Sequence, residues 1–196
     1  VVRHGPFDAM DCVYGAGLSL NTLGQLEASL SSFRLAQRLQ RLHPLGSAAA
    51  AAPSLARCRA AAQAESSHPY PSCGTFRASA DLFHDALGGA PCRFEPSLVF
   101  PGAVVFVNTL LLPDFALNKH PFIPHPYTLV THCSDAPAPA EFEGVLDDPR
   151  LIAWHAQNPD LTHHPALHPL PIGIANPAFP HGDVAVLSAA AAGVPG

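Results

Sequence analysis

Polar side chains follow an apolar segment near the middle of the chain. Residues 127–131 read Tyr-Thr-Leu-Val-Thr. His132 follows them directly, and Asp135 lies three positions after His132. If this segment is a buried strand, Asp135 lies just beyond its carboxyl end, where parallel-sheet enzymes place groups that accept sugar hydroxyls or act as bases. We therefore take Asp135 as the candidate acid/base or acceptor-binding residue.

Hydrogen-bonding and stacking groups also occur further along the chain. Gln157 and Asn158 carry amides suited to hydroxyl recognition, and the ring of Trp154 can stack on a sugar or a base. Gly173, inside an apolar segment, would permit a close approach of the backbone to a ligand. Each also has an ordinary structural interpretation: Asp135 as a helix cap, Trp154 as core, Asn158 as the end of a helix.

The histidines and cysteines do not have the spacing of metal ligands. There are 12 histidines and 5 cysteines, with no HExxH and no CxxC pair. We therefore predict no metal site and no cofactor. Because the cysteine number is odd and their spacing wide, we expect buried apolar cysteines and no disulfide scaffold. They are Cys12, Cys58, Cys73, Cys92 and Cys133.

Composition excludes several classes of protein. The 196 residues carry a formal charge of −5 and a single lysine, Lys119, which argues against a nucleic-acid binder. No long uncharged stretch resembles a membrane span. The chain begins at Val1 and ends in Gly-Val-Pro-Gly, so we expect a fragment, and its compartment stays open.

The elements that must position these side chains form an α/β pattern in the second half of the chain. Residues 103–107 and 127–131 are short continuous apolar runs, typical of strands buried on both faces. Asp148-Pro149 has the N-cap and N1 residues of a helix, which we expect to carry Leu151, Ile152 and Trp154. A proline-rich apolar segment follows at 170–174. The pattern predicts a parallel, Rossmann-like sheet.

The first half of the chain reads as helical. Apolar spacing predicts helices over 22–42 and 54–65, and a short helical run over 78–87. The spacing over 17–36 also fits one tetratricopeptide-like helix pair. The expected organisation is a helical segment at 1–65, a Pro/Gly-rich connector at 66–96, an incomplete α/β lobe at 97–187 and a disordered tail at 188–196.

Several blocks of the second half resemble an exostosin-like, glycosyltransferase-like family of large DNA viruses and eukaryotic algae. The resemblance spans about 104–183 and departs from the family pattern at Cys133, His155, Ala166 and Phe179. The blocks, in order, are YTLVTHCSD (127–135), LIAWHAQN (151–158), HPAL (164–167), LPIGIAN (170–176) and PHG (180–182).

This resemblance implies a two-lobed fold of which the chain holds the first lobe. The second lobe would follow the PHG block and bind the sugar nucleotide. The implied reaction is transfer of a sugar from a nucleotide-sugar donor to a hydroxyl of a glycan or protein acceptor, with Asp135 catalytic. The implied substrate-binding residues are His132, Trp154, Gln157, Asn158, Gly173, Asn176 and His181.

The N-terminus offers an alternative. Val-Val-Arg-His-Gly at 1–5 resembles the strand-to-loop signature of the histidine phosphatase superfamily, and two later blocks fall in matching order. In that interpretation His4 attacks phosphorus, Arg3 and Arg57 neutralise the phosphate oxygens, and His132 completes the anion pocket. A third interpretation is a non-catalytic fragment.

Overall fold

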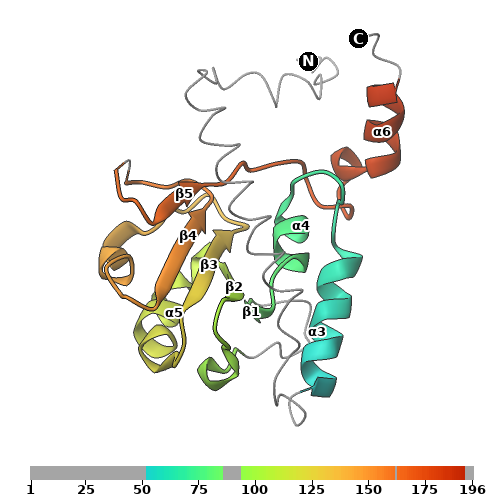
Figure 1. Ribbon diagram of the computed structural model, residues 1–196. Coiled ribbons are helices and arrows are strands. Elements are labelled where there is room, and N and C mark those ends of the chain that lie inside the picture. The colour runs from blue at the N-terminus through green and yellow to red at the C-terminus, as the bar shows by residue number, and fades with distance from the viewer. Residues whose placement is uncertain (1–51, 86–93, 162, 193–196) are drawn as a thin grey trace.

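The computed structural model (Figure 1) describes residues 52–85, 94–161 and 163–192. Its α-helices and strands, in chain order, are α3 (Ala52–Ala64), α4 (Cys73–Ala78), β1 (Leu82–His84), β2 (Ala103–Asn108), α5 (Leu112–Asn118), β3 (Tyr127–His132), β4 (Leu151–Ala156), β5 (Leu167–Pro169) and α6 (Val184–Ala192). Short 3-10 helices are η1 (Pro96–Leu98), η2 (Thr109–Leu111), η3 (His120–Phe122), η4 (Ala140–Val145) and η5 (Pro180–Gly182).

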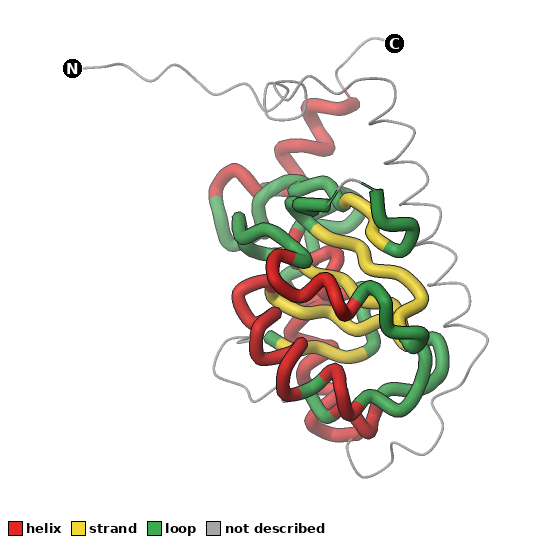
Figure 2. Tube along the Cα trace, turned by 90° about the vertical axis from the view of Figure 1, so that its left-hand side faces the viewer, coloured by secondary structure: helices red, strands yellow, loops and turns green. Residues whose placement is uncertain are grey.

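The five strands form one parallel sheet in the order β1-β2-β3-β4-β5, visible as a single layer in Figure 2. Strands β2 and β3 pair over their full lengths, from Ala103 against Tyr127 to Asn108 against His132. Nearly every residue of both strands is buried, as an apolar run enclosed on both faces requires. The α/β parallel-sheet fold predicted from the sequence is confirmed.

Helices cover the sheet on both faces, because alternate residues of each strand point to opposite sides. Val105 and Leu129 pack in one core with Phe115 of α5. Val104, Phe106 and Val130 pack in another with α3 and α4. Figure 1 shows α3 and α4 together on one side of the sheet and α5 on the other. The residues described thus form three layers, with the sheet between helices on either side.

The helix predicted after Asp148-Pro149 is wrong, since residues 151–156 form strand β4. Asp148 caps a turn instead: its Oδ1 accepts from the Arg150 N–H at 2.8 Å, and its carbonyl accepts from the Leu151 N–H at 2.9 Å. The following residues then pair with β3 on one side and β5 on the other. An Asp-Pro pair can begin a helix or form a turn that leads into a strand. Here the pairing of β4 with β3 and β5 favours the strand.

Other boundaries also differ from the sequence prediction. The helix predicted at 54–65 is confirmed as α3, whereas that at 22–42 lies outside the described residues. The helical run predicted over 78–87 is wrong, because β1 occupies part of it and pairs with β2. The segment 66–96 is therefore more than a connector. At the other end, α6 extends to Ala192, so the predicted tail is helical over 188–192.

Within the part of the chain that the structure describes, no helix has both the length and the apolar character to cross a membrane.

Candidate functional site

A pocket of about 320 Å³ lies at the carboxyl edge of the sheet. Parallel α/β folds bind their ligands at this edge. The lining residues come from the ends of β3 and β4, from α4 and from the segment after β5: Cys73, His132, Cys133, Ser134, Asp135, Gln157, Ile172, Ile174, Ala175, Asn176 and Phe179. The structure thus brings together four of the predicted site residues, His132, Asp135, Gln157 and Asn176.

Strand pairing positions the first half of this set. His132 is the last residue of β3, and Gln157 directly follows β4, where its N–H donates to the Thr131 carbonyl at 2.9 Å. The Gln157 Oε1 atom accepts from the Cys133 N–H at 3.1 Å. Since β3 and β4 are neighbours, the residues that follow them lie side by side.

The segment after β5 closes the pocket by pairing with the chain that leads into α4. Ile174 forms a bridge with Ser72 and donates its N–H to the Pro71 carbonyl at 2.9 Å. The Asn176 Oδ1 atom accepts from the Gly74 N–H at 2.8 Å. These bonds hold residues 172–176 against the start of α4.

Three polar groups of the pocket keep capacity for a ligand. The exposed carboxylate of Asp135 has no hydrogen-bond or ion-pair partner among the described residues. The Gln157 and Asn176 oxygens accept backbone bonds, which leaves both amide –NH₂ groups as donors. The ring of Phe179, 55% exposed, lies among the lining residues. The pocket therefore combines an acceptor, two donors and an aromatic face.

His132 is a neutral, fully committed side chain. Its Nε2 atom lies 3.0 Å from the Pro171 carbonyl oxygen and must donate to it, while Nδ1 accepts from the Cys133 N–H at 2.8 Å. Burial is the main cause that lowers the pKa of His132 to about 4. The positive charge of Arg77 also lowers this pKa, whereas the hydrogen bond to the Pro171 carbonyl raises it. At neutral pH this residue positions the chain at the edge of the pocket.

A disulfide joins Cys73, at the start of α4, to Cys133, directly after β3, across a Cα separation of 5.1 Å. The expectation that the cysteines carry no disulfide is therefore wrong at this pair. The two positions are 60 residues apart in the sequence, and their proximity depends on α4 packing beside the end of β3. No local spacing in the sequence indicates it.

Four predicted binding residues do not line the pocket: Trp154, Asn158, His181 and Gly173. Trp154 is fully buried and donates its indole N–H to Thr131 Oγ1 at 2.9 Å, so it belongs to the core. Asn158 is exposed, in a left-handed turn with φ of 53°. His181 lies beside the ring of Phe179, with ring centroids 5.8 Å apart.

A glycine is required at position 173 because the backbone of another segment of the chain lies close to it. Its φ is 73°, and a Cβ atom at this position would lie 2.2 Å from the Pro71 carbonyl oxygen. The close approach predicted for this glycine is thus to the chain before α4.

The described residues give no support to the phosphatase alternative. Arg57 is exposed on α3, and both ring nitrogens of His132 are engaged within the protein. A phosphate pocket needs cationic or donating groups that remain available to the anion. Arg3 and His4 lie outside the described residues.

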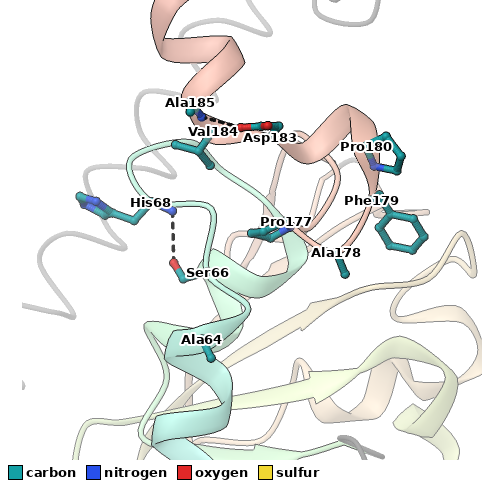
Figure 3. Close-up of a pocket in the computed structure, with 10 residues that line it drawn as sticks. All are labelled: Ala64, Ser66, His68, Pro177, Ala178, Phe179, Pro180, Asp183, Val184 and Ala185. Atoms are coloured by element: carbon teal, nitrogen blue, oxygen red, sulfur yellow. Dashed lines mark hydrogen bonds between the residues drawn. The ribbon is translucent and has the colours of Figure 1, made fainter.

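A second hollow, of about 710 Å³, lies between the end of α3 and the start of α6 (Figure 3). Two of its polar side chains form hydrogen bonds within the protein: Ser66 Oγ accepts from the His68 N–H at 3.2 Å, and Asp183 Oδ1 accepts from the Ala185 N–H at 2.8 Å. We therefore place the candidate site at the carboxyl edge of the sheet.

Comparison with protein-family models, curated proteins and solved structures finds no match for this chain.

Proposed function

We propose that the pocket at the carboxyl edge binds a sugar, and that the chain is a glycosyltransferase-like protein whose described lobe holds the hydroxyl acceptor. The observation that carries this proposal is the convergence of Asp135, Gln157 and Asn176, each with an uncommitted polar group, from three separate segments. Sugars present alternating donors and acceptors on a partly apolar ring, which this combination complements.

The size of the pocket favours a small ligand. Its volume of about 320 Å³ lies at the lower end of the range for ligand pockets, roughly 300–1,000 Å³. One sugar ring fits such a space, whereas a whole nucleotide sugar requires further surface. The nucleotide-sugar donor is therefore assigned to a part of the protein beyond the described lobe.

In this mechanism Asp135 acts as general base. Its carboxylate accepts the proton of the acceptor hydroxyl while that oxygen attacks the anomeric carbon of the donor. The new glycosidic C–O bond forms as the bond from the anomeric carbon to the nucleotide diphosphate breaks, and the diphosphate leaves with the electron pair. Gln157 and Asn176 orient the acceptor by donating hydrogen bonds to its neighbouring oxygens.

The proposal is tested by saturation-transfer NMR on the chain with a panel of monosaccharides and short glycans. Asp135→Asn keeps the shape of the side chain and removes the charge, so we expect at least tenfold weaker binding of the preferred sugar. Glu141→Gln, on an exposed carboxylate outside the pocket, is the matched control and should bind as the wild type does.

Transfer from a panel of nucleotide sugars to the same ligand is then measured for both variants. We expect at least a tenfold loss of rate for Asp135→Asn with an unchanged melting temperature. No sugar binding by the wild type, or equal sugar binding by the two variants, would contradict the proposal.

A further inference from the structure

A cluster of soft ligand atoms lies in the wall of the pocket. The sulfur atoms of Cys73 and Cys133 and a ring nitrogen of His132 all lie within 4.8 Å of one another. Two thiolates and one imidazole form the three-residue ligand set of a zinc site that keeps an open position. In the structure the sulfurs are joined as a disulfide, so such a site exists only in the dithiol form.

The hydrogen bonds of His132 prepare it to be a ligand. Its Nε2–H is held by the Pro171 carbonyl at 3.0 Å, which fixes the hydrogen on Nε2 and leaves the Nδ1 lone pair as the acceptor. Metal-bound histidines commonly donate their other N–H to a backbone carbonyl in this way, because it fixes the tautomer and the ring orientation. In the disulfide form the Nδ1 lone pair takes the Cys133 N–H.

A buried cation lies beside both sulfur atoms. Arg77 Nη2 lies 3.5 Å from the Cys73 sulfur and 3.6 Å from the Cys133 sulfur. The same arginine is ion-paired with Asp85 at 2.7 Å and with Glu65. These carboxylates balance its charge, so it does not oppose a divalent cation as an isolated positive charge would.

We propose that the reduced chain binds Zn²⁺ through Cys73, Cys133 and His132, with the fourth position open to the pocket at the carboxyl edge. The inference is independent of sugar binding. Both cysteines are partly exposed and line the pocket, so a reductant and an ion can reach them. Soft thiolates with imidazole select zinc over magnesium or calcium.

The two forms are connected by thiol–disulfide exchange with a dithiol reductant. The reductant transfers two electrons and two protons, so that the protein disulfide becomes two thiols and the reductant becomes a disulfide. Zn²⁺ then displaces the two thiol protons to solvent and binds two thiolates and the neutral imidazole. Exchange with a small-molecule disulfide reverses this step: the oxidant takes up two electrons and two protons and becomes two thiols, the protein disulfide re-forms, and the ion is released.

The proposal is tested by titrating Co²⁺, as a spectroscopic substitute for Zn²⁺, into the full chain with and without prior reduction by a phosphine. We expect thiolate-to-cobalt charge-transfer absorption in the reduced chain, displaced by Zn²⁺, and none in the oxidised chain. Cys73→Ser should abolish the band, and His132→Gln should weaken binding at least tenfold. His125→Gln, at an exposed histidine outside the cluster, is the control for His132→Gln and should retain it.

A second measurement uses only the wild type, so its result does not depend on whether the variants fold. In the reduced wild type, Zn²⁺ should slow alkylation of Cys73 and Cys133 by iodoacetamide at least tenfold, as measured by peptide mass spectrometry. Absence of the cobalt band in the reduced wild type, a band that survives Cys73→Ser, or alkylation unaffected by Zn²⁺ each overturns the proposal.

Discussion

The buried imidazole of His155 makes the fold sensitive to acid. The ring is 1% exposed in β4, and burial, together with the neighbouring His168, lowers its pKa from 6.5 to about 4. As the pH falls below about 6.5, the unfolded chain takes up a proton here before the folded chain does. The stability contributed by the neutral ring is therefore present above this pH and is lost progressively down to about pH 4.

The magnitude follows from these two pKa values. For pKa values of 6.5 unfolded and about 4 folded, linkage gives a loss of about 2 kcal/mol between pH 7 and pH 5 from this one ring. That is a large part of a typical stability of about 5–15 kcal/mol. The phenylalanine variant His155→Phe keeps an aromatic ring and removes the titration, so it should lose about 2 kcal/mol less than the wild type over the same interval.

Urea unfolding at a series of pH values measures this difference, and the single tryptophan is a convenient reporter because Trp154 is fully buried beside His155. His125→Phe, at an exposed position, is the control for adding an apolar ring and should show the pH dependence of the wild type. If wild type and His155→Phe lose equal free energy of unfolding between pH 7 and pH 5, the reasoning from burial is refuted.

Two substitutions test the contacts that shape the pocket. Gly173→Ala would place a Cβ atom 2.2 Å from the Pro71 carbonyl oxygen at a φ of 73°, so we expect about 3 kcal/mol lower stability in urea unfolding; a loss under about 1 kcal/mol would show that the segment adapts. Arg77→Met leaves the buried Asp85 carboxylate without its cation and should cost about 4 kcal/mol. Arg57→Met, at an exposed arginine, should change stability by under about 0.5 kcal/mol, and equal effects of the two would contradict the assignment of a buried ion pair.

Two strands of the sheet could be predicted from the sequence, because a strand that is buried on both faces consists of a continuous run of apolar residues. Residues 103–107 and 127–131 are uninterrupted apolar runs, and their context in a parallel sheet follows from that. Strand β4 was missed because its start carries the turn residues Asp148-Pro149, which equally suit a helix, and because His155 interrupts its apolar pattern. Only pairing with β3 and β5 identifies it as a strand.

The residues of the candidate site that could be predicted are those at or just after the carboxyl ends of strands. His132, Asp135 and Gln157 come directly after apolar segments, and in a parallel sheet the carboxyl ends share one edge. Trp154 lies inside a strand and packs in the core, which is the second of the two interpretations that the sequence leaves open for it. Cys73 could not be found, because α4 reaches the edge of the pocket from a distant part of the chain and nothing in the sequence around it signals this.

The two proposals share one backbone group, and this determines how they can be separated. The Cys133 N–H donates both to Nδ1 of His132 and to Oε1 of Gln157. When Nδ1 turns to a metal ion, the same N–H keeps its bond to Gln157, so the amide that faces a sugar retains its orientation. Asp135→Asn should therefore weaken sugar binding without affecting cobalt binding, whereas Cys73→Ser should abolish cobalt binding and leave sugar binding within about threefold. Loss of both functions in either variant would mean that the pocket and the cluster form a single site.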